Sequence, residues 1–160
     1  MRVRLDDGDY SRLLDFRDGL RRFLHWSGER AGEAGLTPAQ HQLLLAVRAH
    51  DGAGHPTVGD VADHLLLRHH SAVGLVDRAE AAGLVARSTD PADHRVVRVR
   101  LTALGSRRLA ALTALHVEEL RRLGAQGFPI WAGLDEAPPS PAPVPPAAPA
   151  PRPVGRVSRR

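Results

Sequence analysis

The sequence has no cysteine and no lysine, and its aromatic residues are limited to two Trp, one Tyr and three Phe among 160 residues. Without cysteine, neither a disulfide nor a thiolate metal site can form, and a cysteine nucleophile is excluded. No apolar stretch approaches the ~20 residues of a membrane-spanning helix, and acids interrupt the first ten positions before an apolar signal segment could develop. We therefore expect a soluble, cytoplasmic protein with no membrane partner.

Acidic residues are absent after position 137, whereas Arg152, Arg156, Arg159 and Arg160 lie in that part of the chain. The whole chain has 22 basic residues, all of them arginine, and 18 acidic ones, for a formal net charge of +4. Without the last four arginines the remainder carries 18 charges of each sign and is neutral. Nucleic-acid binding by this remainder must depend on where arginines lie, because net charge cannot supply it.

The motifs of common enzymes are also missing. We find no Gly-rich phosphate loop, no nucleophile elbow and no evident pair of spaced acids, so no enzymatic activity is expected. The 9 histidines raise the question of zinc, which needs three or four converging ligands. His69 and His70 point to different sides of a helix, and Asp60 with His64 supplies only two ligands. The sequence therefore predicts no metal site and no cofactor.

Composition divides the chain at position 138. Residues 138–160 are rich in Pro and Ala, which predicts a disordered or polyproline II tail. The tail is either passive or a loose contact to DNA phosphate. Residues 1–137 are predicted to form one mostly α domain with a small β-hairpin.

The first long helix is predicted over residues 9–32 by apolar residues at spacings of three and four. This stripe consists of Tyr10, Leu13, Phe16, Leu20, Phe23 and Leu24. It is suited to packing in a core, or to forming a surface for a partner helix.

Three shorter helices are predicted next. Thr37 with Gln40 forms a capping box at the start of one, and Thr57 is the candidate cap of the next, with Asp60 near its positive end. The third ends at Gly83. The expected buried positions of the second and third are Val58, Val61, Ala62, Leu65, Ala72, Leu75, Val76 and Ala79.

Strand-forming residues at 84–89 and 95–101 flank the turn 90–94 and predict a hairpin, after which helical periodicity returns over 102–124. Two short helices followed by a hairpin make a winged helix-turn-helix. The second short helix suits a DNA major groove, and an arginine at the hairpin end suits the electronegative minor groove.

These residues resemble the MarR family of bacterial transcription regulators. The similarity lies in the segment from Leu75 to Arg78, in Gly83-Leu84-Val85 with Arg87, in the wing residues 90–95, and in Leu101-Thr102 with Gly105. By element order the resemblance covers about residues 9–124. It implies a winged-helix lobe at about 37–105 and dimerisation helices at about 9–32 and 102–124.

The resemblance also implies roles for individual residues. Arg95 matches the wing arginine that enters the minor groove, and Asp93 matches the acid that supports the wing, by pairing with Arg87 or by capping its own turn. Arg78 either contacts phosphate or pairs with an acid on its own helix. The full set of predicted DNA-binding residues is Arg68, His69, His70, Ser71, Gly74, Arg78 and Arg95.

By the same resemblance we expect a homodimer that binds a palindromic operator on double-stranded DNA as a ligand-responsive repressor. The family's usual last helix is missing, and Phe128, Ile130 and Trp131 could form a short docking segment in its place. The resemblance also implies a binding site for a small aromatic or anionic effector. Its candidate lining residues are Phe16, Arg17, Leu20, Phe23 and His41. The competing interpretation is a winged-helix module for protein interaction without specific DNA binding.

Overall fold

The computed structural model describes residues 6–52 and 54–125. Five helices and one two-stranded antiparallel sheet follow the predicted order, which confirms the predicted fold class. The elements are α1 Asp7–Glu33, α2 Pro38–Arg48, α3 Val58–His64, α4 His69–Ala81, β1 Val85–Thr89, β2 Val97–Leu101 and α5 Ala103–Ala125. The expected docking segment at Phe128–Trp131 and the expected tail at 138–160 lie outside the described residues.

The predicted helix starts at Thr37 and Thr57 are confirmed in atomic detail. The Thr37 hydroxyl accepts from the Gln40 amide at 3.2 Å, and the Gln40 side chain accepts from the Thr37 amide at 2.9 Å. Thr57 and Asp60 form the same reciprocal pair at the start of α3. These bonds satisfy amides that a helix cannot pair internally, so two of the helix boundaries are determined by local sequence.

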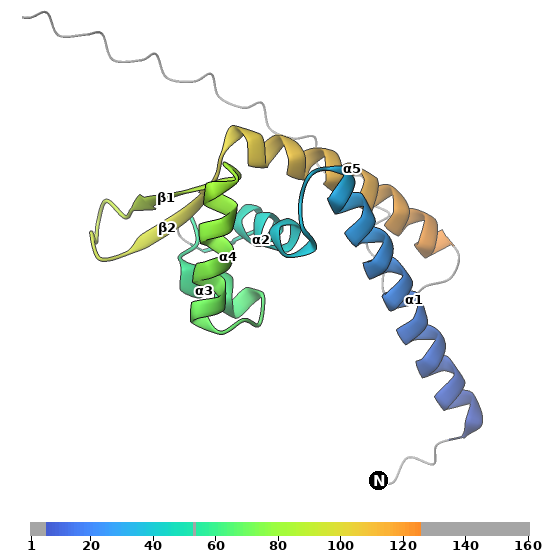
Figure 1. The fold of residues 1–160 in the computed structure, drawn as a ribbon. Coiled ribbons are helices and arrows are strands. Elements are labelled where there is room, and N and C mark those ends of the chain that lie inside the picture. The colour runs from blue at the N-terminus through green and yellow to red at the C-terminus, as the bar shows by residue number, and fades with distance from the viewer. Residues whose placement is uncertain (1–5, 53, 126–160) are drawn as a thin grey trace, which may run out of the picture.

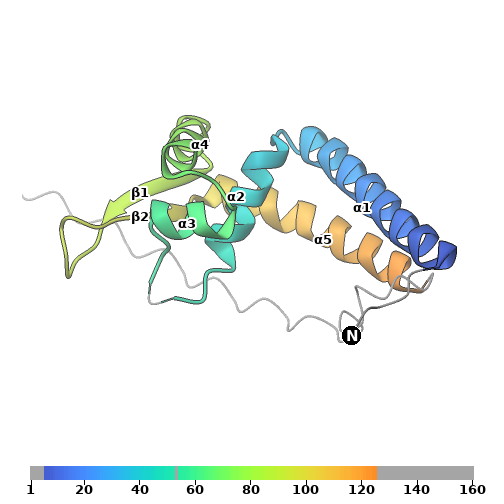
Figure 2. The same ribbon diagram turned by 90° about the horizontal axis from the view of Figure 1, so that it is seen from below.

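The helices form two regions (Figures 1 and 2). The long helices α1 and α5 lie side by side at one end of the molecule, while α3, α4 and the hairpin lie at the other, with α2 between them. We call residues 38–101, from α2 to the end of β2, the winged lobe. Among the described residues no helix is long and apolar enough to cross a membrane.

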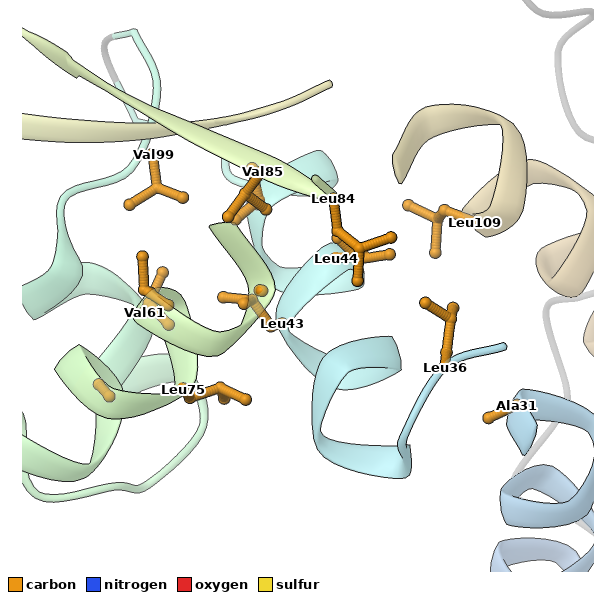
Figure 3. Close-up of a cluster of buried hydrophobic side chains, with 14 of the residues drawn as sticks. Ala31, Leu36, Leu43, Leu44, Val61, Leu75, Leu84, Val85, Val99 and Leu109 are labelled. Carbon is orange, nitrogen blue, oxygen red and sulfur yellow. The ribbon is translucent and has the colours of Figure 1, made fainter. Parts of the chain in front are cut away.

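The core lies mainly in the winged lobe and extends to Ala31 of α1, to Leu36, and to Leu109 and Leu112 of α5 (Figure 3). Leu44, Leu84 and Leu109 point toward one another from α2, the segment before β1, and α5. All eight positions predicted to face inward on α3 and α4 are buried or pack against this cluster. The core therefore holds α4 by its apolar face and leaves the opposite face in solvent.

The hairpin is held to the lobe by backbone bonds as well as by packing. Val85 pairs with Leu101 and Thr89 with Val97, so β2 begins two residues later than predicted. The strand begins later because the Val96 amide donates a hydrogen bond to the Asp93 carbonyl at 2.9 Å, which keeps residues 93–96 in a turn. On its other edge β2 meets the segment before α3, where the Val99 amide donates to the Pro56 carbonyl at 2.8 Å.

The apolar stripe of α1 is not part of this core. Five of its six residues are between 39% and 61% exposed, namely Tyr10, Leu13, Phe16, Leu20 and Leu24, and Phe23 is half-buried. Of the two uses that the sequence left open for the stripe, core packing within this chain is therefore not the one observed.

Candidate DNA-binding surface

The outer face of α4 is polar and open to solvent. His69, His70, Ser71 and Arg78 are exposed, and Gly74 between them is half-buried. These residues lie around the solvent-exposed side of the helix, His69 and His70 at different positions on it, because Ala72, Leu75, Val76 and Ala79 hold the other face in the core. The geometry presents a row of hydrogen-bonding groups on a helix of 13 residues.

The start of α4 differs from the starts of α1, α2 and α3. Each of those three helices begins with a complete capping box. At α4, within the described chain, the capping position is Arg68 and no side chain caps the first amides. The positive end of this helix therefore carries an arginine and no neutralising acid in its first turn, which favours an anion such as phosphate.

Four exposed arginines of α4, its N-terminal cap and the hairpin form no ion pair within the described part of the chain. They are Arg68, Arg78, Arg95 and Arg100. For Arg78 the structure answers a question that the sequence left open, because the neighbouring acids Asp77 and Glu80 are both engaged by another residue. These arginines place positive charge on α4 and the hairpin of a chain whose first 137 residues are neutral. Exposed arginines without an ion pair also lie on other described elements, among them Arg17 of α1, Arg48 of α2 and Arg107 of α5.

The expected pairing of Arg87 with Asp93 is wrong. The Arg87 guanidinium instead binds Asp77 at 2.6 Å and Glu80 at 2.6 Å, and the Arg87 amide donates to Glu80 at 2.9 Å. These bonds hold the pKa of the Glu80 carboxyl below its ordinary value, the amide bond contributing most. Arg87 is the central residue of β1, and its bonds to Asp77 and Glu80 join β1 to α4 and not to the hairpin tip.

Asp93 acts locally. Its carboxylate accepts from the Arg95 backbone amide at 3.0 Å, which is the turn-forming role that the sequence offered as the alternative. Arg95 itself lies in the exposed turn, between strands β1 and β2.

Sequence reasoning missed one ion pair in the hairpin. The Arg98 Nε donates to Asp90 Oδ2, and this bond is the main reason that the pKa of the Asp90 carboxyl is lowered. Arg98 pairs across the hairpin with Ser88, so Asp90, two residues beyond Ser88, is its diagonal neighbour. The alternation of Arg98, Val99 and Arg100 in the sequence indicates that Arg98 and Arg100 lie on the same face of the strand. Assigning Asp90 as the partner of Arg98 also requires the register between β1 and β2, which the sequence does not give.

The five predicted effector residues are spread over α1 and α2. Phe16, Arg17 and Leu20 are exposed on α1, Phe23 is half-buried, and His41 on α2 is 2% exposed. The described groove of about 380 Å³ includes none of them. It lies beside the turn between α3 and α4 and is lined by Ala39, Gln42, His64, Leu65, Leu66, Leu67 and Leu75.

His41 belongs to a buried cluster that joins α1, α2 and α5. Its ring contacts His116 in a tilted arrangement at a centroid distance of 4.7 Å, and the Trp26 ring lies 4.8 Å from that of His116. The His116 Nδ1 faces the Leu112 carbonyl at 2.8 Å, and Nε2 faces the Ser27 hydroxyl at 2.7 Å. Burial, with a smaller effect of His116, lowers the pKa of His41 to about 4, so His41 is neutral at pH 7 and offers no charge to an anion.

The fold and the exposed face of α4 define a winged helix-turn-helix protein, and comparison with known proteins narrows this class. The sequence model of the MarR family matches residues 34–96. The chain is 39% identical over 83 residues to the transcriptional activatory protein BadR of Rhodopseudomonas palustris, and 35% identical over 68 residues to the uncharacterized HTH-type transcriptional regulator YsmB of Bacillus subtilis. These matches cover 51% and 42% of the chain, and in each case 47% of the relative.

Solved structures agree over a larger part of the chain. A single-residue mutant of MepR from Staphylococcus aureus, bound to an oligodeoxyribonucleotide, shares 26% identity and superposes with a TM-score of 0.59. The similarity covers 73% of this chain and 83% of that one. In sequence over residues 34–96 and in fold, the chain is similar to MarR family regulators, which agrees with the resemblance of its wing residues. Both curated relatives are named as regulators of transcription and not as enzymes.

Proposed function

We propose that this protein is a transcriptional regulator that binds double-stranded DNA through α4 and the hairpin. The observation that carries the proposal is the set of exposed arginines without ion pairs on the two elements that a winged helix directs at DNA, among them Arg68, Arg78 and Arg95. In this arrangement α4 lies in the major groove, with His69, His70, Ser71 and Gly74 toward base edges and phosphates.

Arg95 is assigned the minor-groove contact. It lies in the solvent-exposed turn 91–95, and its guanidinium has no competing acid among the described residues. A narrow minor groove concentrates negative potential, which attracts an arginine without requiring a particular base. Since the rest of the domain adds no net positive charge, this contact is expected to contribute a large share of the affinity.

We further propose that the active form is a homodimer. The stripe on α1 leaves large apolar side chains in solvent, and Leu115 on the neighbouring α5 is 47% exposed. An apolar surface of this extent on two adjacent helices favours association with a second copy. Two winged lobes related by a two-fold axis would read a palindromic operator with half-sites roughly one helical turn apart.

Ligand response and repression form a finer part of the proposal. A small aromatic or anionic effector would bind near Phe16, Arg17 and Leu20 of α1. Phe23 would lie on the inner side of this site, and neutral His41 would form part of its wall. A dimer closed over the operator would repress by excluding polymerase. The relative BadR is described as activatory, so a transcription assay with the cognate promoter decides the direction.

The test is a fluorescence polarisation titration with DNA from upstream of the protein's own gene, at fixed salt, against a scrambled duplex. We expect tighter binding to the upstream DNA, and about tenfold weaker binding by Arg95→Ala. Arg121→Ala is the matched control, since it also removes one arginine charge. Arg121 lies near the C-terminal end of α5, and this end of the helix is remote from the hairpin (Figure 2). Addition of phenolic acids then tests release by an effector.

A winged-helix module for protein interaction is the second candidate. It is supported by the neutral charge of residues 1–137. Such a module would bind the upstream and scrambled duplexes equally weakly, and Arg95→Ala would not change its affinity. That result would exclude the proposed regulator.

A further inference from the structure

The hairpin tip, residues 90–96, has little apolar packing to hold it. Residues 91–95 are all exposed, and Val97, just beyond the tip, is 42% exposed. A polar turn of this kind loses conformational entropy when it is ordered, and packing does not compensate for that loss here. Its conformation must come from hydrogen bonds.

One chain of hydrogen bonds leads from the body of the winged lobe toward this tip. It begins at the His55 carbonyl, in the loop before α3, which accepts from Arg98 Nη1 at 2.6 Å. The Nε of the same guanidinium donates to Asp90 Oδ2. Both side chains are well shielded, with 24% of Arg98 and 12% of Asp90 exposed, which distinguishes this pair from solvated surface pairs.

The second half of the chain runs from Asp90 to Arg95. The other carboxylate oxygen of Asp90 accepts from the Ala92 amide at 2.8 Å and the Asp93 amide at 3.2 Å. The Asp93 carboxylate in turn accepts from the Arg95 amide at 3.0 Å. The backbone of Arg95 is therefore connected through Asp93, Asp90 and Arg98 to the loop that precedes α3.

We propose that Arg98 and Asp90 are positioning residues that hold Arg95 in the orientation required for its DNA contact. The inference rests on the proposed DNA-binding function and adds two residues to it. An unordered tip would lose conformational entropy when it binds DNA, and this loss would weaken the affinity. The preformed turn has already lost that entropy during folding. Arg98 and Asp90 are expected to act through Arg95 and not by touching DNA.

Asp90→Asn separates positioning from simple electrostatics. The substitution keeps an oxygen for the turn amides, removes the ion pair with Arg98, and removes one negative charge beside the DNA. If Asp90 acted only by repelling phosphate, the variant would bind more tightly. Positioning predicts the opposite sign, an affinity lower by about fivefold, with the same loss in Arg98→Met because both changes break one link.

A double-mutant cycle with Arg95→Ala tests whether the effect passes through the tip. In that background, Asp90→Asn and Arg98→Met are expected to change the affinity by less than about twofold, because the group that they position is gone. If Arg98→Met still weakens binding there, Arg98 contacts phosphate directly and the proposal is overturned. Tighter or unchanged binding by Asp90→Asn in the Arg95-containing protein also overturns it.

Backbone ¹⁵N relaxation of the full chain without DNA provides a readout that does not depend on affinity. We expect lower order parameters at residues 91–95 in Asp90→Asn than in the unmodified protein, with α4 unchanged. Equal order in the two proteins would refute the positioning role. Failure of the unmodified protein to bind DNA would refute the proposed function itself, which is a different result from specific binding that Asp90→Asn leaves unaltered.

Discussion

At the scale of single residues, Gly105 shows how closely α5 is joined to the winged lobe. A Cβ at this position would overlap the Leu84 carbonyl oxygen and lie 2.9 Å from its carbonyl carbon. The Leu84 carbonyl already accepts from the Thr102 amide at 3.0 Å. The Thr102 hydroxyl accepts from the Gly105 amide and donates to the Gly83 carbonyl at 2.6 Å. Only a residue without a side chain fits between these groups.

Gly105→Ala is therefore expected to lower the free energy of unfolding by about 2–4 kcal/mol, because the backbone of the α5 start must move away from Leu84. Urea denaturation followed by circular dichroism measures the change. Gly32→Ala is the matched control, since Gly32 is helical and an added Cβ would meet no other atom within 4 Å. That variant should gain up to about 1 kcal/mol. Equal stabilities for the two variants would contradict the close approach at Leu84.

At the scale of elements, the buried histidines join the long helices to the lobe. His41 comes from α2 and His116 from α5, while Ser27 and Trp26 of α1 complete the contacts. Polar groups at such a junction are satisfied only when the three helices keep their relative positions. Their protonation therefore affects the stability of the junction.

Acid is expected to weaken this junction. The pKa of His41 is lowered to about 4 from an ordinary value of 6.5, so between these values the unfolded chain binds a proton that the folded chain excludes. Stability contributed by neutral His41 is thus complete above pH 6.5 and falls by about 2 kcal/mol between pH 7.5 and pH 5.

Urea midpoints at pH 7.5, 6 and 5 test this expectation, and His41→Leu should show a shallower decline than the unmodified protein. The window stays above pH 5 because most carboxyl groups of the unfolded chain titrate lower. Parallel pH dependences for the two proteins would show that His41 does not carry the effect.

At the scale of the whole molecule, the exposed stripe on α1 predicts self-association. Leu13→Glu places a charge among apolar residues of this surface, where Leu13 is 57% exposed, and is expected to yield a monomer in analytical ultracentrifugation. Affinity for a full operator should fall with it, because one lobe contacts only one half-site.

Leu66→Glu is the control for this change. Leu66 is an even more exposed leucine, at 93%, but it lies in the turn between α3 and α4 and not on the long helices. We expect this variant to remain a dimer. A monomeric unmodified protein, or a dimer unaffected by Leu13→Glu, would contradict the assignment of the interface to α1.

Much of the fold could be predicted because its signals are local. The capping boxes at Thr37 and Thr57 determine helix starts within four residues, and the buried face of α4 follows from helical spacing alone. The candidate DNA contacts were named from resemblance, and they remain predictions that the variants above test. The predicted wing support was partly wrong because the sequence offers Arg87 acids in both α4 and the hairpin turn, and only the fold shows that those of α4 lie next to it.

The sequence by itself determined the order of the elements, the inward faces of α3 and α4 and the neutrality of residues 1–137, since each depends on neighbours along the chain or on a count. Tertiary structure alone decided that Arg87 joins α4, that Arg98 joins Asp90 and the His55 carbonyl, and that His41 is buried against His116. These contacts join residues from different elements, so they depend on strand register and helix packing, which are collective properties of the folded chain.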